Sequence, residues 1–125
     1  MKKQLATNHA PQAIGPYSQG VTVGNMVFVS GQLPIHAETG IMPEGISEQA
    51  KASLTNIKNI LAEADLSMND VVKTTIFLDN MADFTAVNEV YGNFFEEPYP
   101  SRSTVEVAKL PKDAKVEIEA IAFKN

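Results

Sequence analysis

Apolar residues recur every three or four positions in two stretches of the chain. In residues 47–64 they follow an i, i+4, i+7, i+11 spacing with charged residues elsewhere, which predicts an amphipathic helix. Residues 82–95 show a similar stripe, and Asn80 and Asp83 resemble capping residues at its start. The Pro-rich residues 97–100 are expected to end this second helix.

Several shorter stretches have the composition and alternation of β-strands. Residues 21–23 and 26–30 are separated by Gly24-Asn25, a two-residue connection typical of a tight hairpin. Residues 71–79 are rich in β-branched and aromatic residues on both faces, which is typical of a strand inside a sheet. Two further strands are expected within residues 101–122, around a Leu-Pro-Lys-Asp turn.

The predicted order is strand, strand, helix, strand, helix, strand, strand, in one domain spanning residues 1–125. Within this domain, residues 1–20 form an extended lead-in before the first predicted strand. This order indicates the α+β class. Because two amphipathic helices need a common apolar surface, we expect a single sheet with both helices on one face. By alternation, the last two strands should turn Val105, Val107, Val116, Ile118 and Ala120 toward the helices and Arg102, Thr104, Glu117 and Glu119 toward the other face.

The face of the sheet away from the helices is not fully polar. Four apolar side chains are expected to point away from the helices, namely those of Val71, Phe77, Ile121 and Phe123. A half-apolar sheet face without a covering helix predicts a partner. We therefore expect a homo-oligomer that buries this face and gathers polar groups of neighbouring subunits at the contact.

Composition narrows the classes of function. The chain has no cysteine, which excludes disulfides, zinc–thiolate sites and a thiol nucleophile. His9 and His36 have no metal-binding spacing, so we expect no metal site. The formal net charge of -5 opposes nucleic-acid binding. No apolar run is long enough to cross a bilayer, and we expect a cytoplasmic protein.

Arg102 is the polar residue of the predicted strands that most needs an explanation. One interpretation is a surface ion pair with Glu106 or Glu119. The other is a small-anion site, because a guanidinium group binds carboxylate or phosphate through two parallel hydrogen bonds. A nearby glutamate such as Glu117 can move a proton, although glutamates alternating on a strand are also typical of a solvated face. Both interpretations remain open at this point.

Three segments carry a resemblance to a known family: IGPYSQG at residues 14–20, VSGQLP at residues 29–34 and SRSTVEVAKLPKDAKVEIEAIA at residues 101–122. Together they resemble the reactive intermediate deaminase family, the YjgF-like enamine/imine deaminases known as RidA. The runs GNMVFVSGQ, VVKTTIFL and DFTAVNEVY belong to the same resemblance, which therefore covers nearly the whole chain.

The resemblance implies a fold and an activity. The fold is a chorismate-mutase-like α+β domain that forms a homotrimer, with a central barrel of sheets and clefts between subunits. The activity is hydrolysis of 2-imino acids, such as 2-iminobutanoate and 2-iminopropanoate, to 2-oxo acids and ammonia without a metal or organic cofactor. Pyridoxal-phosphate dehydratases acting on threonine and serine supply these imines in the family's setting.

The resemblance also implies roles for single residues. Arg102 should bind the substrate carboxylate, Glu117 should position or activate water, and Tyr17 should donate a hydrogen bond to the substrate. Further substrate contacts fall on Ser30, Gly31, Asn88, Ser103 and Thr104. Thr104 stands where many relatives have cysteine. We expect the chain to be active without this thiol, because a carboxylate, water and an arginine suffice for imine hydrolysis.

Alternatives from other functional classes remain. The same cleft would suit a non-catalytic trimer that binds 2-oxo acids or acts like a chaperone. Another alternative is an RNA-cleaving translation inhibitor, but the excess of acidic residues in the chain argues against RNA binding. A structural interaction module is disfavoured because the polar groups form a cleft-like set. The sequence leaves open the preferred imino acid, the dehydratase that supplies it and the effect of Thr104.

Overall fold

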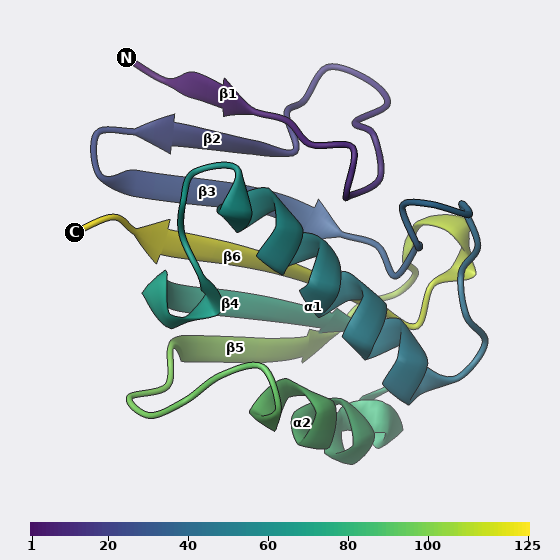
Figure 1. Ribbon diagram of the computed structural model, residues 1–125. Coiled ribbons are helices and arrows are strands. Elements are labelled where there is room, and N and C mark those ends of the chain that lie inside the picture. Colours follow the sequence, from purple (N-terminus) through teal and green to yellow (C-terminus); the bar gives the residue numbers. More distant parts are fainter.

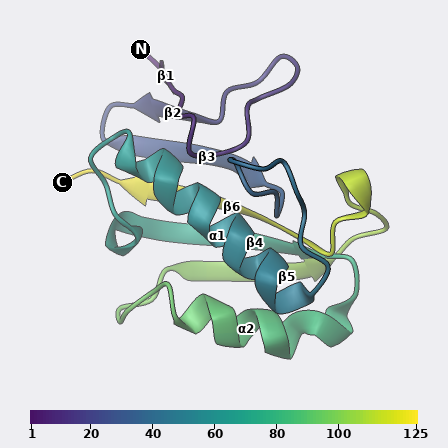
Figure 2. The same cartoon turned by 45° about the vertical axis from the view of Figure 1, so that its right-hand side comes forward.

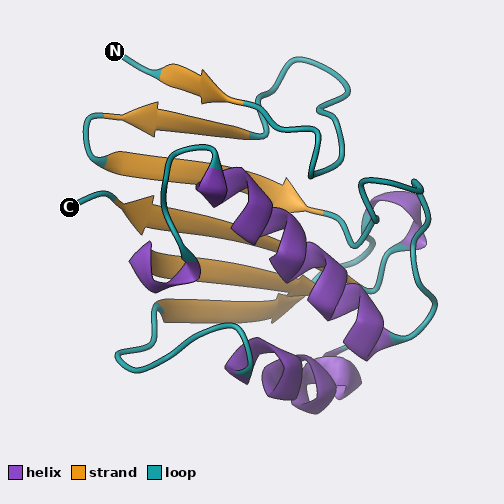
Figure 3. Ribbon diagram, in the orientation of Figure 1, coloured by secondary structure: helices purple, strands orange, loops and turns teal.

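The computed structural model describes residues 1–125 and is built around one six-stranded sheet of order β1-β2-β3-β6-β4-β5 (Figure 1). Its strands are β1 (Lys3–Leu5), β2 (Gly20–Val23), β3 (Met26–Gln32), β4 (Val71–Leu78), β5 (Ser101–Glu106) and β6 (Val116–Phe123). The helices are α1 (Ile46–Ala62) and α2 (Phe84–Gly92), with short 3-10 turns at Met68–Asp70, Met81–Asp83 and Pro111–Asp113. Both helices lie on one face of the sheet, as predicted (Figure 3).

The carboxy-terminal strands are not neighbours in the sheet. β5 pairs with β4 in parallel, and β6 pairs antiparallel with both β3 and β4. β4 therefore lies between the two strands that flank the Leu-Pro-Lys-Asp turn. Helix α2 connects β4 to β5 and lies along the β5 edge of the sheet (Figure 2). This parallel connection brings residues of α2 beside residues of β5.

The predicted elements match the structure except at their ends. The second helix is shorter than predicted at both ends. At its start Met81–Asp83 form a 3-10 turn, in which the side chain of Asn80 accepts a hydrogen bond from Ala82 N at 2.9 Å, and at its end the helix stops at Gly92 rather than Phe95. Within the predicted lead-in, β1 was missed. It pairs with β2, and only Leu5 of its three residues is buried, so its sequence carries no alternation to predict it from.

The hydrophobic core lies between the helices and the sheet. α1 contributes Leu54, Ile57, Ile60 and Leu61, each without exposed surface. Strand β6 contributes every second residue, from Val116 to Ala122, as the alternation predicts. Full burial of a Leu or Ile side chain stabilises the fold by about 1.5–3 kcal/mol. The core therefore fixes which face of β6 is turned away from the helices.

The predicted facing is wrong for β5. Arg102 is paired with Thr74 and Thr104 with Ile76, and both β4 partners are buried on the helix side. Arg102 and Thr104 therefore also lie on the helix side, and Val105 is exposed on the other face. The expectation failed because β5 is an edge strand, where the helix side lies beside α2 rather than under the core. For Glu117 and Glu119 of β6 the predicted facing is confirmed.

The face without helices, which we call the open face, is partly apolar. Its apolar side chains include Val23, Phe28, Phe77, Val105, Ile121 and Phe123, and Glu117 and Glu119 lie among them. Val71, expected to point this way, is instead buried in the core because the β4–β6 register shifts between Val71 and Lys73. Neither helix is long and apolar enough to cross a membrane.

Candidate functional site

Helix α2 holds the side chain of Arg102. Nη1 of Arg102 donates a hydrogen bond to Oδ1 of Asn88 at 2.8 Å. The guanidinium carbon lies 4.8 Å from the centre of the Tyr91 ring and 5.3 Å from that of Phe84. A guanidinium group over aromatic faces gains cation–π attraction and keeps its edge free for planar partners. We call Asn88, Arg102 and Thr104 the arginine group.

The ion-pair interpretation of Arg102 is wrong. The salt bridge in the structure joins Lys109 to Asp113, both highly exposed, and none involves Arg102. Glu106, one of the proposed partners, accepts a hydrogen bond from Met81 N at 2.8 Å instead. A guanidinium group has five N–H donors, of which the structure assigns one here to a protein acceptor. The remaining donors suit an anion.

Glu117 lies beside an irregularity in the neighbouring strand. Val29 pairs with Ala120 and Gln32 with Ile118, so the β3–β6 register shifts across Ser30 and Gly31. A Cβ atom at Gly31 would overlap with Oε2 of Glu117. The missing side chain of Gly31 thus provides the space that the carboxylate occupies. Bulges of this kind commonly re-aim side chains next to functional sites.

The environment of Glu117 favours its protonated form. Partial burial raises the pKa of the Glu117 carboxyl above its ordinary value, and the negative charge of Glu119 raises it further. A carboxylate whose pKa is moved toward neutrality is a stronger base than an ordinary surface glutamate. This property is what a group that removes a proton from water requires.

Tyr17 reaches the same region from a loop held by Gln19, a residue that the sequence analysis missed. The buried Gln19 side chain accepts from Thr7 N at 2.7 Å, and its Nε2 lies within hydrogen-bond distance of three carbonyl oxygens, those of Thr7, Ala10 and Pro11. Ser30 Oγ donates to the carbonyl of Ser18 at 2.6 Å. These bonds fix both ends of the loop, while Tyr17 itself is half exposed.

Four of the predicted site residues line one pocket of about 740 Å³: Tyr17, Ser30, Gly31 and Glu117. We call these four residues the glutamate pocket. Lys112 of the Leu-Pro-Lys-Asp turn also lines it and adds a positive charge that the sequence analysis did not include. A carboxylate, a phenol and backbone groups around a space of this size can accommodate a small polar molecule.

The arginine group and the glutamate pocket are separate within one chain. Glu117 pairs with Phe77 of β4, and Phe77 pairs with Val105 of β5, so a strand lies between the two sets. Arg102 is on the helix side and Glu117 on the open face. Ser103, also a predicted contact, is exposed on the open face beside Thr75. One copy of the chain therefore does not bring all the predicted site residues together.

Thr104 carries a hydroxyl group without a partner. Its Oγ1 atom is buried and makes no hydrogen bond within the chain. Buried hydroxyl groups are usually satisfied, because leaving one unpaired costs about 1–3 kcal/mol. An unpaired hydroxyl two residues from Arg102, on the same side of β5, is a feature that a bound ligand or a second chain would explain.

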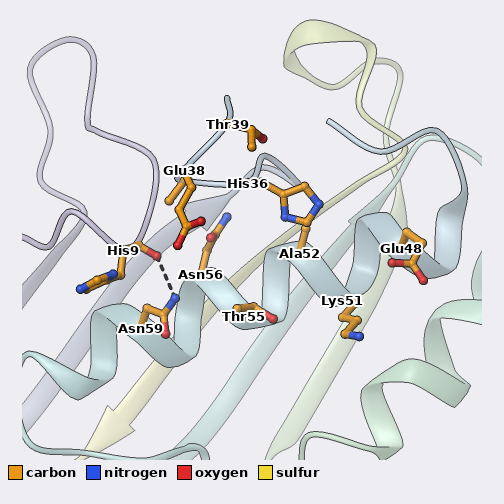
Figure 4. Close-up of a pocket in the computed structure, with 11 residues that line it drawn as sticks. His9, His36, Glu38, Thr39, Glu48, Lys51, Ala52, Thr55, Asn56 and Asn59 are labelled. Carbon is orange, nitrogen blue, oxygen red and sulfur yellow. Dashed lines mark hydrogen bonds between the residues drawn. The ribbon is translucent and has the colours of Figure 1, made fainter. Parts of the chain in front are cut away.

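A second pocket, of about 470 Å³, lies over α1 and contains none of the predicted site residues (Figure 4). His9 and His36, which are far apart in sequence, both line it. Its amides connect loops to the helix: Asn59 donates to the carbonyl of His9 at 2.8 Å, and Asn56 donates to that of Ile35 at 2.9 Å. No group of three side chains there or elsewhere is arranged to hold a metal ion.

Comparisons with known proteins give matches along the whole chain. The family model described as Endoribonuclease L-PSP matches residues 7–124. The putative reactive intermediate deaminase TdcF of Escherichia coli K12 is 52% identical, with 100% of this chain and 99% of the relative covered. The 2-iminobutanoate/2-iminopropanoate deaminase of the same strain is 51% identical, with both chains fully covered. The crystal structure of E. coli TdcF with bound serine superposes with a TM-score of 0.94 at 51% identity, covering 98% of this chain and 99% of that one.

Proposed function

Because the chain belongs to the Endoribonuclease L-PSP family and matches curated deaminases over its full length, we propose that it is a 2-iminobutanoate/2-iminopropanoate deaminase. It hydrolyses reactive 2-imino acids to 2-oxo acids and ammonia. The observation that carries this proposal in the structure is the Arg102 guanidinium group, which has no acidic partner and is held by Asn88 and two aromatic rings. Such a group is a ready receptor for a substrate carboxylate.

The reaction needs one nucleophilic water and a base. Arg102 binds the α-carboxylate through two hydrogen bonds and so orients the planar C=N group. Glu117 removes a proton from water as the water oxygen bonds to the carbon of the protonated imine, and the π electrons of the C=N bond move to the positively charged nitrogen. Glu117 then gives this proton to the amino nitrogen of the carbinolamine, the C–N bond breaks as the C=O bond forms, and the hydroxyl proton passes to the Glu117 carboxylate and on to solvent. The net change is protonated imine plus water to oxo acid plus ammonia and a proton.

The remaining predicted residues complete the cleft in this proposal. Tyr17 donates a hydrogen bond toward the substrate, and Ser30 with Gly31 supplies polar backbone groups beside Glu117. From β5, Thr104 contributes its side chain and Ser103 its backbone groups. The unpaired hydroxyl group of Thr104 supports this role.

We further propose that the protein is a homotrimer with clefts between subunits. Two observations support it: the arginine group and the glutamate pocket lie on different sides of the sheet, and the open face is partly apolar. A contact between two different surfaces is head-to-tail and gives a closed ring when the rotation closes. The resemblance to the family favours three copies, each cleft joining the arginine group of one to the glutamate pocket of the next.

The direct test is the variant Arg102→Ala in a coupled assay, in which a threonine dehydratase generates 2-iminobutanoate. Loss of the charge-assisted contact should lower kcat/KM by the equivalent of about 2–5 kcal/mol. Lys109→Ala is a matched control, because it removes another cation, one that lies in an exposed ion pair. Decay of the imine at the wild-type rate in Arg102→Ala would overturn the site assignment.

The coupled assay also addresses the alternatives. A trimer that only binds 2-oxo acids would bind 2-oxobutanoate without accelerating imine decay. RNA cleavage is favoured by the family description, and it predicts RNA degradation that copurifies with the protein and is lost in Arg102→Ala. Location in the cytoplasm remains a prediction that cell fractionation can test.

A further inference from the structure

A buried pair of hydroxyl groups lies next to Arg102. Thr74 Oγ1 and Tyr91 OH are 2.7 Å apart, and either of them can be the donor. Thr74 is on β4 and Tyr91 is on α2, and both residues are 95% or more buried. Their contact therefore ties the helix to the sheet at one point. None of the roles described above uses it.

The geometry links this pair to the guanidinium group. In the parallel β4–β5 register, Thr74 is the partner of Arg102, so both side chains leave the sheet on the same side. The Tyr91 side chain contacts both residues. Its hydroxyl group is hydrogen-bonded to Thr74, and the centre of its ring is 4.8 Å from the guanidinium carbon of Arg102. The ring is thus fixed at one end and supports Arg102 with its face.

The chemistry of the pair is suited to a fixed support. Burial raises the pKa of the Tyr91 hydroxyl group above its ordinary value, so the phenol stays neutral at physiological pH. The ring also contacts that of Phe95, with centroids 4.5 Å apart. A ring held by a hydrogen bond on one side and packing on another cannot rotate freely. An arginine on such a ring loses less conformational freedom when it binds a planar anion.

We propose that Tyr91, anchored by Thr74, is a positioning residue that orients the Arg102 guanidinium group for the substrate carboxylate. This inference rests on the proposed function of Arg102 and adds two residues to it. Asn88 holds one edge of the guanidinium group through Nη1, and the Tyr91 face sets its plane. The unused N–H donors are then directed as a pair, which bidentate binding of a carboxylate requires.

The experiment compares two ligands that differ in charge at one position. Affinities for 2-oxobutanoate and its neutral amide, 2-oxobutanamide, are measured by calorimetry in wild type, Tyr91→Phe, Thr74→Val and Thr74→Ser. Removing either hydroxyl group should weaken 2-oxobutanoate binding about threefold to tenfold, the range expected for one hydrogen bond, and leave the amide unchanged. Thr74→Ser keeps a hydroxyl group and should restore most of the loss.

Controls separate the inference from general damage and from the function itself. Tyr99→Phe removes a phenolic hydroxyl group from an exposed side chain and should bind both ligands as wild type does. Equal weakening of acid and amide in Thr74→Val would indicate a merely structural role and overturn the inference. If Arg102→Ala weakens acid binding while Tyr91→Phe and Thr74→Val do not, the inference fails and the proposed function stands. If Arg102→Ala binds the acid normally, the proposed function fails as well.

Discussion

At the scale of single residues, Gly31 controls the space beside Glu117. Replacing it with alanine puts a Cβ atom where Oε2 of Glu117 lies, so the carboxylate must move. We expect Gly31→Ala to lower kcat/KM by about tenfold to a hundredfold, because small misplacements of a reacting group are costly. The measurement is the coupled imine assay, with the thermal midpoint recorded in parallel.

Gly92→Ala is the matched control for this prediction. A Cβ atom there meets nothing within 4 Å, and alanine is the better helix former. It should retain wild-type activity with equal or higher stability. Full activity in Gly31→Ala would show that Glu117 has room to adjust, and would remove the argument for a fixed carboxylate.

Glu119 tunes the acidity of Glu117. Its charge helps to raise the pKa of Glu117, so Glu119→Gln should lower that pKa. If Glu117 is the base, as proposed, it acts in its ionised form, and the acid limb of the kcat/KM profile should move to lower pH. Glu63→Gln, an exposed substitution on the far side of the sheet, should leave the profile unchanged. An unshifted acid limb in Glu119→Gln would contradict the assignment of Glu117 as the base.

The same pKa shift affects stability. The folded protein holds the Glu117 proton more tightly than the unfolded chain does, so folding is disfavoured as pH rises between the unfolded and the folded pKa. Above the folded pKa this cost is fully present. The carboxylate is therefore kept at a site that opposes its own charge, which is typical of groups selected for chemistry.

Sequence reasoning at this scale found the chemical groups and, as expected substrate contacts, two residues beside them, Asn88 and Gly31, but not their other supports. A guanidinium group on a strand pointed to an anion site, and the comparison of motifs gave Glu117. Tyr91 and Thr74 were not identified, because their contact depends on the parallel register of β4 and β5, which neither strand's own pattern reveals. Gln19 was missed for a related reason, since its four contacts are with backbone groups whose positions only the fold defines.

At the scale of elements, the backbone of residues 7–11 is held by hydrogen bonds to the Gln19 side chain rather than by pairing with a strand. Gln19→Ala leaves buried backbone groups without partners, and we expect it to lower the free energy of unfolding by about 2–3 kcal/mol. Because the same bonds hold the loop that bears Tyr17, KM should also rise. Urea unfolding and the imine assay measure the two effects.

Gln4→Ala provides the comparison, since Gln4 is exposed on β1 and its side chain makes no hydrogen bond in the structure. That variant should change stability by no more than about 0.5 kcal/mol. If Gln19→Ala behaved like Gln4→Ala, water would be replacing the lost bonds and the loop would not depend on Gln19.

The elements were predicted best where periodicity and burial agree. α1 and β6 each present one face to the core, and their sequences show it. β5 was predicted as a strand but with its faces exchanged, because at a sheet edge the helix side can hold polar groups such as Arg102. The short strand β1 is defined by its pairing with β2, and a run of three residues is too short for an alternation pattern to predict that pairing.

At the scale of the whole molecule, the separation of the arginine group from the glutamate pocket allows the proposed shared cleft to be tested by mixing two inactive variants. Arg102→Ala and Glu117→Gln should each be nearly inactive alone. When the two are unfolded together and refolded, about a quarter of the clefts should receive an intact residue from each side if assembly is random and head-to-tail. Imine hydrolysis should therefore reappear in the mixture.

The control mixes Arg102→Ala with the double variant Arg102→Ala/Glu117→Gln, which can form no intact cleft. Activity in the first mixture at the level of this control would place the site within one chain and contradict the shared cleft. The half-apolar open face was the sequence feature that predicted an oligomer. Alternation describes one strand at a time, so it does not predict which residues of the open face would meet in the proposed oligomer.

If the cleft is shared between copies as proposed, the division of the site between two faces also links ligand concentration to assembly. A 2-oxo acid bound between two copies would then stabilise the assembled form over separated chains, by an amount that grows with the logarithm of its concentration above Kd. Dilution would then reduce the fraction of assembled protein, and added 2-oxo acid would counter that loss. The product of the proposed reaction would therefore favour the oligomer, and assembly would be most complete where the product concentration is highest.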